Sequence, residues 1–240
     1  MVNIFSMMSE LLEICKKVKL LAYFGSYTRQ EDFIEEISDI NIFAITDNKE
    51  ILLELGSLGY SPIIANEDTL RTLCEKGDPI CYYLLYDSNI ICGKFPENLV
   101  FKLTPFTCER LRKAIFTFLS LAISAYLRRD EISLSSNSFR AMRNLIQWKS
   151  CIKDSSIPIK ISDLRNKCKE LNMMICNEFS DVILSRKLRS PIPFIGLEKI
   201  VNNVFKELGI NKTLKLSELL ISVKNPMQVI INEDGSIIVK

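Results

Sequence analysis

A change of pattern near residue 103 constrains the fold of this 240-residue chain more than any other feature. Before that point, short apolar runs alternate with amphipathic segments. After it, almost every long segment has helical periodicity. Alternation is typical of a sheet with helices packed on it, whereas uninterrupted helical periodicity is typical of a bundle. The sequence therefore predicts an α+β or α/β domain with a mixed sheet, followed by an α-helical domain.

The first hundred residues predict three helices and four strands. Residues 18–24, VKLLAYF, are short and almost wholly apolar, which indicates a strand buried on both faces. Pro62 indicates that the third strand is an edge strand or that the proline lies at a strand end, because proline cannot donate to a ladder. The predicted helices cover residues 4–17, 49–58 and 67–76, and the predicted strands cover residues 18–24, 40–45, 60–65 and 80–86.

The rest of the chain predicts a bundle and a terminal hairpin. SPIP at 190–193 must interrupt the bundle, since two prolines cannot lie inside a helix. The last residues hold two apolar triplets around a turn sequence, the pattern of a β-hairpin. The predicted helices cover residues 108–129, 137–153, 162–188 and 197–208. We therefore predict a first domain of residues 1–102, a helical bundle of residues 103–225 and a β-hairpin of residues 226–240.

Charge and hydropathy give no sign of a membrane or of a strongly charged partner. The chain has 31 Lys and Arg against 29 Asp and Glu, a net charge of +2, so any basic surface must be local. The most membrane-like run, residues 114–127, is shorter than a bilayer requires. We read this run as a buried core helix and predict no membrane partner.

The chain has eight cysteines and no histidine. The cysteines form no Cys-x-x-Cys pair, which argues against a zinc site. Glu10 and Glu13 interrupt the N-terminal apolar patch before a signal-peptide core can form. These features predict a cytoplasmic protein with mostly free thiols. An intracellular protein of a hyperthermophile, in which disulfides do occur, remains the alternative.

One stretch, residues 24–46, carries residue types suited to phosphate chemistry. Gly25 directly follows an apolar strand and lets a ligand approach the backbone closely, while Ser26 can offer a hydroxyl and free amides to a phosphate. The alternative is a plain turn in which Ser26 is the N-cap of a helix. Further on, Asp39 and Asn41 share one face of a strand, because side chains alternate along it.

Together, Gly25-Ser26, Arg29 and Ser38-Asp39-Ile40-Asn41 resemble the nucleotidyltransferase superfamily, which includes polymerase beta, the minimal nucleotidyltransferases and the aminoglycoside-modifying enzymes. Residues 77–95 are more weakly similar to the last strands of stand-alone members. The resemblance covers roughly the first hundred residues. It implies transfer of a nucleoside monophosphate from a nucleoside triphosphate to a hydroxyl, with Mg²⁺ neutralising charge on the transferred group.

The resemblance also implies a role for each residue of the motif. Gly25, Ser26 and Arg29 are the implied nucleotide-binding residues. Asp39 and Asn41 occupy the implied catalytic positions, and Asp39 is the implied metal ligand. The acceptor of the nucleotide, an RNA or a protein, is left open.

Two departures from the family pattern weaken the expectation of catalysis. Members carry a second carboxylate where this chain has Asn41, whose carbonyl is an uncharged acceptor. They usually carry a third carboxylate on a following strand, but residues 60–65 contain no acid. Asp78 and Asp87 are the remaining candidates, although both lie beside turn signals. We therefore predict a weakly active or inactive enzyme.

Two other functions remain open at this stage. One is a non-catalytic nucleotide-binding regulatory protein that keeps Gly25, Ser26 and Asp39. The other is a structural partner subunit or a homo-oligomer, assembled through the helical domain or through the edge of the terminal hairpin.

The second predicted bundle helix has a polar and an apolar face. The polar face holds Arg140, Arg143, Asn144 and Gln147, and the opposite face holds Ala141, Leu145, Trp148 and Ile152. A solvated face over an apolar one is the simple interpretation, and a surface that contacts phosphate or RNA is the alternative. Residues 143–149 faintly resemble helical domains of the HEPN type, some of which cleave RNA with an arginine and a histidine. Without a histidine that chemistry is excluded here.

Overall fold

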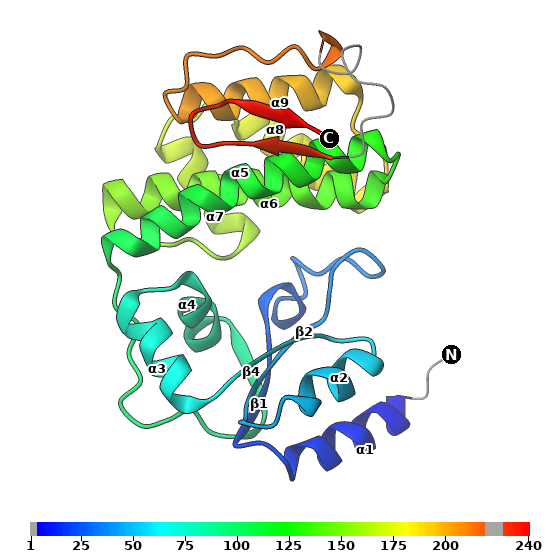
Figure 1. The fold of residues 1–240 in the computed structure, drawn as a ribbon, viewed down its shortest axis with the longest axis vertical. Helices are drawn as coiled ribbons and strands as arrows, with labels where there is room; N and C mark the ends of the chain where they lie inside the picture. Colours follow the sequence, from blue (N-terminus) through cyan, green and yellow to red (C-terminus); the bar gives the residue numbers. More distant parts are fainter. Residues whose placement is uncertain (1–3, 219–227) are drawn as a thin grey trace. The chain divides into compact units, whose positions relative to one another are not determined.

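The computed structural model describes residues 4–218 and 228–240 and divides into two compact units, Met1–Thr107 and Cys108–Lys240 (Figure 1). The terminal hairpin belongs to the second unit. Within the described ranges, no helix is both long enough and apolar enough to cross a bilayer.

The first unit is a mixed α and β structure, as its alternating pattern predicts. Its four-stranded sheet has the order β3-β2-β1-β4, in which β1 is antiparallel to β2 and β4 while β2 and β3 are parallel. Its elements are α1 (Ile4–Cys15), β1 (Leu20–Phe24), the 3-10 helix η1 (Gly25–Thr28), β2 (Asn41–Ile45), α2 (Glu50–Ser57), β3 (Ser61–Ala65), α3 (Glu67–Lys76), α4 (Pro79–Tyr86) and β4 (Ser88–Gly93). The prediction that Pro62 lies in an edge strand is confirmed.

The two central strands are buried on both faces of the sheet. Alternate residues of β1 and β2 pack against α1 and α2 on one side and against α3 and α4 on the other (Figure 1). Leu21 and Ile42 belong to the first cluster, and Leu20 and Phe43 belong to the second. This double burial explains why VKLLAYF is apolar at nearly every position.

The strand predicted for residues 80–86 is wrong, because these residues form helix α4. Asp78 caps this helix by accepting a hydrogen bond from the amide of Ile80 (3.0 Å), and Pro79 occupies its first turn. A short run that is apolar all round cannot be assigned by periodicity, so the cap was the deciding signal. The last strand of the sheet lies further on, in β4.

Gly93 is the position of the sheet that is least tolerant of a side chain. Its φ is +78°, and a Cβ atom would lie 2.0 Å from the carbonyl oxygen of Lys19. We expect Gly93→Ala to lower the free energy of unfolding by about 3 kcal/mol, since it combines a left-handed backbone with a backbone clash. Urea denaturation followed by circular dichroism measures this loss.

Two other glycines are matched controls for that substitution. Gly59 has a φ of +85° but nothing within 4 Å of its Cβ position, so Gly59→Ala should cost only about 1 kcal/mol. Gly56 lies in α2 with the same open space, and Gly56→Ala should stabilise the protein by roughly 0.5–1 kcal/mol. Equal losses for Gly93→Ala and Gly59→Ala would mean that the backbone at Lys19 moves aside easily.

The second unit is helical and ends in the predicted hairpin. Its elements are most of α5 (Pro105–Leu127), α6 (Glu131–Asp154), α7 (Ile161–Glu170), α8 (Cys176–Leu188), α9 (Phe194–Glu207), β5 (Val229–Ile231) and β6 (Ile237–Val239), with β5 antiparallel to β6. The break at 190–193 is confirmed between α8 and α9. The single helix predicted for residues 162–188 is instead two helices, because Asn172 adopts a left-handed φ of 51° between them.

The predicted polar face of α6 is only partly solvated: Arg140 and Arg143 are half-buried, and the prediction is wrong for the other two residues. Asn144 and Gln147 are buried, while Ile152 on the opposite face is exposed. The amide group of Asn144 donates to the carbonyl of Arg140 (2.7 Å), and that of Gln147 donates to the carbonyl of Pro158 (2.8 Å). Helix α6 contacts α7, α8 and α9, so these amides satisfy backbone carbonyls inside the unit.

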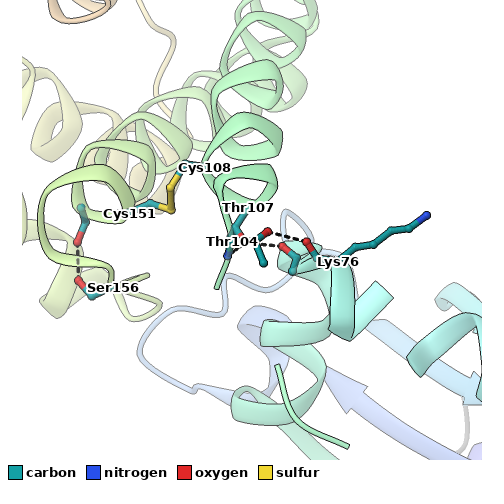
Figure 2. The surroundings of a disulfide bond; sticks show 8 residues. Lys76, Thr104, Thr107, Cys108, Cys151 and Ser156 are labelled. Carbon is teal, nitrogen blue, oxygen red and sulfur yellow. Dashed lines mark hydrogen bonds between the residues drawn. A yellow bond between two sulfur atoms is a disulfide. The ribbon is translucent and has the colours of Figure 1, made fainter. Parts of the chain in front are cut away.

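All eight cysteines are paired in four disulfides, which overturns the prediction of mostly free thiols. The bonds are Cys15–Cys92, Cys74–Cys81, Cys108–Cys151 and Cys168–Cys176. Figure 2 shows the third of them, which joins α5 to α6. Each bond connects two different elements, and none has a Cys-x-x-Cys spacing, so sequence spacing gave no sign of them. Such pairing is typical of oxidising compartments and of intracellular proteins of hyperthermophiles.

Candidate functional site

The two halves of the sequence motif meet at one end of the sheet. Phe24, the last residue of β1, pairs with Asn41, the first residue of β2. A Cβ atom on Gly25 would lie 3.3 Å from Nδ2 of Asn41, so the Asn41 side chain lies directly against this glycine. The φ of Gly25 is +80°, a conformation that other residues rarely adopt. The glycine therefore gives both the turn and the close approach.

Ser26 lies in the short helix η1 rather than at the start of an α-helix. The N-cap position of η1 is Phe24, which makes no side-chain capping bond, so the alternative role of Ser26 as an N-cap is wrong. Ser26 is partly exposed beside this turn. Four residues of 3-10 helix give little dipole, so a phosphate would depend on individual amides and on the hydroxyl group.

Asp39 lies two residues before β2 and is exposed. The side-chain amide of Asn41 donates a hydrogen bond to the backbone carbonyl of Asp39 (3.4 Å). On the other side of β2, the register partner of Asn41 is Ser61 of β3. The strand next to Asn41 therefore offers a hydroxyl and no acid, whereas the superfamily that the motif resembles usually has a third carboxylate on a following strand.

The two other candidate acids serve local structure. Asp78 caps α4. Asp87 follows α4, and its carboxylate accepts hydrogen bonds from Thr28 (3.1 Å) and Arg29. Within residues 4–218 and 228–240, no group of three or more His, Cys, Asp or Glu residues is arranged to hold a metal ion. Asp39 and Asn41 would offer a Mg²⁺ ion one charged and one neutral oxygen, which is less ligand charge than the superfamily resemblance implies for a catalytic site.

Arg29, a predicted nucleotide-binding residue, lies in a buried ion network. Its Nε donates to Asp32 (2.6 Å), and one terminal nitrogen bonds both Asp87 and the carbonyl of Gly25 (3.2 Å to the carbonyl). The side chains of both acids are almost fully buried. Burial alone would lower the pKa of Arg29, but the hydrogen bonds to Asp87 and Asp32 outweigh it and raise the pKa. The guanidinium thus ties the turn after β1 to the residue before β4.

Sequence reasoning missed both partners of Arg29. Asp32 lies three residues after it, a spacing at which opposite charges on a helical turn often meet. Asp87 is separated from Arg29 by 58 positions and gave no local signal. Its one hint was its position directly before a strand that flanks β1.

Aromatic side chains also line this end of the sheet. The ring of Tyr27 contacts those of Tyr23 and Phe33, with centroids 4.8 and 5.2 Å apart. The hydroxyl groups of Tyr23 and Tyr60 lie 3.4 Å apart, and burial together with this contact raises the pKa of Tyr23. The partly exposed Tyr27 is the aromatic surface next to Ser26 that a base could contact.

The raised pKa of Tyr23 predicts a loss of stability at high pH. Above pH of about 10 the unfolded chain releases this proton while the folded protein retains it, so the free energy of unfolding should fall as the pH rises. Tyr23→Phe keeps the ring and removes the proton, and should flatten this slope in denaturation at pH values from about 9 to 11. Tyr86→Phe, at an exposed ring, is the control. An unchanged slope in Tyr23→Phe would assign the effect to other groups.

No family model, curated protein or solved structure matches this chain. Its function is therefore inferred from the geometry of its own residues.

Proposed function

We propose that the first unit is a nucleotidyltransferase-like domain that binds a nucleoside triphosphate at the Gly25-Ser26 turn and transfers the nucleotide weakly or not at all. The contact between Gly25 and the side chain of Asn41 is the observation that supports this proposal most directly. It brings the turn suited to phosphate next to the positions that would hold a metal.

In this proposal each residue has a limited task. The bare backbone at Gly25 and the hydroxyl of Ser26 receive the triphosphate, because a missing Cβ permits close approach. Asp39 supplies the one carboxylate for a divalent ion that accompanies the nucleotide. Such an ion would neutralise phosphate charge when bound. With Asn41 and Ser61 as neutral neighbours, the site has too little negative charge to hold a metal firmly.

Arg29 acts on the turn and not on the nucleotide in this proposal. Its guanidinium is committed to Asp32, Asp87 and the carbonyl of Gly25. These bonds hold the Gly25 backbone in its left-handed conformation without a ligand. Binding therefore needs no reordering of the turn, which lowers its entropic cost.

Restoring the second acid tests this proposal. Asn41→Asp adds a negative oxygen beside Asp39 with nearly the same volume, and we expect it to raise the affinity for Mn²⁺ and a non-hydrolysable triphosphate about tenfold. Calorimetric titration of both forms measures the change. Transfer to RNA or protein acceptors should stay near background, since Ser61 still replaces the third acid.

Asn89→Asp is the matched control, because it adds the same charge at an exposed position of β4. It should leave the affinity unchanged. Unchanged or weaker binding in Asn41→Asp would mean that this end of the sheet hosts no metal and nucleotide, and would refute the proposal.

The terminal hairpin favours a second candidate function, that of a partner subunit or homo-oligomer. Gln228 and Lys240 exchange two backbone bonds (3.1 and 2.9 Å), so the amides of Ile237 and Val239 point away from β5. The other edge of this small sheet is satisfied by α5, where Ser120 and Ser124 accept bonds from β5 amides. A second copy could therefore pair with β6. Sedimentation should then show a dimer that Val239→Pro dissociates, and a monomeric native protein would refute it.

A further inference from the structure

A small pocket lies in the second unit where α8 ends and α9 begins. Its volume is about 270 Å³, near the lower end of about 300–1,000 Å³ for ligand sites. Its walls are mainly apolar and include Val182, Leu184, Leu188, Ile192 and Ile200. The connector at 190–193 lines one side, and its prolines keep it out of both helices. The pocket suits a ligand of fragment size.

Glu178 is the feature that gives this pocket a chemical preference. Only 6% of it is exposed, yet it lines the cavity together with the apolar walls and two other charged residues, Asp181 and Lys199. Its Oε1 accepts bonds from Lys199 (2.7 Å) and Asn203 (3.2 Å). Its Oε2 is fully buried and has no hydrogen-bond partner among the residues that the structure describes. The carboxylate is therefore incompletely satisfied, and Oε1, which the exposed Lys199 already reaches, is the oxygen that a new donor can bind.

Lys199 compensates Glu178 only from the solvent side. Its side chain is 62% exposed, so it can move without disturbing the core. The hydrogen bond to Glu178 and the charge of that residue raise the pKa of Lys199, and Asp181 adds to the effect. The pocket therefore has an excess of negative charge next to apolar walls.

We propose that this pocket binds an organic cation, an ammonium or guanidinium group on an apolar body. The cation donates to Oε1 of Glu178 in place of Lys199, which moves toward solvent as the cation enters. The apolar body packs against the walls formed by Val182 and Ile192. Neutral and anionic molecules lack the donor or the charge that the buried carboxylate requires.

The exposed residues at the rim of the pocket indicate the source of such a cation. Leu184 and Leu188 line the pocket and are 55% and 66% exposed, one helical turn apart on α8. A free amine would leave these leucines largely uncovered. A lysine or arginine side chain carried by an apolar peptide would cover them as well.

Titration with cyclohexylammonium tests the proposal. Saturable shifts of backbone amide NMR signals should appear in α8, in the connector and at the start of α9. Cyclohexanol has a similar shape without the charge, and should bind at least about tenfold more weakly. An acetylated, amidated Leu-Lys-Leu peptide identifies the source: tighter binding than the amine points to a side chain, and equal or weaker binding points to a free amine.

Variants of the two charged residues should act in opposite directions. Glu178→Gln should weaken binding of the amine at least about tenfold, because the glutamine side chain keeps the size of glutamate but loses its charge. Asp181→Asn, at an exposed position of the rim, should change affinity less than about threefold. Lys199→Met removes the internal competitor, so the amine should bind more tightly and raise the Tm of this variant more than that of the native protein.

Gly196→Ala keeps the test decisive if Glu178→Gln does not fold. Its Cβ atom would meet Pro193 and Ile192 at 3.4–3.5 Å, which is ordinary packing, and it should narrow the pocket and weaken the amine several-fold. Equal binding of cyclohexylammonium and cyclohexanol would overturn the proposal. So would amine affinity unaffected by Glu178→Gln, or no saturable shift at the solubility limit.

Discussion

Replacing Cys15 and Cys92 together by serine should lower the free energy of unfolding by about 4 kcal/mol. This disulfide joins the end of α1 to β4 and closes a loop of 77 positions in the unfolded chain. Cross-linking so long a loop removes much of the conformational freedom of the unfolded state. Guanidinium denaturation without reductant, followed by circular dichroism, measures the loss.

The bond between Cys74 and Cys81 is the matched control, because its sequence separation is only 7. The same paired substitution there should cost about 2 kcal/mol in the loop-closure model. Equal losses at the two sites would show that strain or local packing, and not chain entropy, decides the effect. Alkylation of all eight cysteines in the unreduced, unfolded protein would contradict the pairing itself.

Local signals in the sequence were sufficient for much of the first unit. Asn66 and Gly77 bound α3 as their residue types predict: Asn66 accepts a bond from the amide of Thr69 (2.9 Å), and Gly77 has a left-handed φ of 79°. The apolar run of β1 likewise matches a strand covered on both faces. These predictions succeeded because caps and double burial depend on residues that are close in sequence.

Predictions that depended on distant residues failed. The Cys15–Cys92 pair and the link between Arg29 and Asp87 both depend on the pairing of β4 with β1, which no local pattern encodes. The prediction of a solvated face on α6 failed for a different reason. Its amides at Asn144 and Gln147 bind backbone carbonyls inside the unit, so polar residue type did not imply exposure.

The candidate site could be predicted from the sequence only in part. The order of the motif placed Gly25 and Asn41 at the junction of two predicted strands, and the antiparallel pairing of β1 with β2 makes them neighbours. The resemblance assigned Arg29 to the nucleotide from its position alone. Its buried partners support the role in the turn that we propose, and this difference can be tested.

Arg29→Met should lower the free energy of unfolding by about 3–5 kcal/mol. The substitution leaves Asp32 and Asp87 buried without their cation, and removing one partner of a buried ion pair is more harmful than removing the whole group. Urea denaturation of the variant measures the cost. If Arg29 only contacted nucleotide, its substitution would leave the free energy of unfolding almost unchanged in this assay.

The triple variant Arg29→Met, Asp32→Asn, Asp87→Asn separates stability from binding. Removing all three charges should recover most of the lost stability, since no buried charge then lacks a partner. If Arg29 only holds the turn, this variant should bind Mn²⁺ and a non-hydrolysable triphosphate less than about tenfold more weakly than the native protein, because the only added cost is that of ordering the turn. If the triple variant is stable but no longer binds the nucleotide, Arg29 is a nucleotide-binding residue after all. The ion network would then be the resting state of a residue that exchanges its two carboxylates for phosphate.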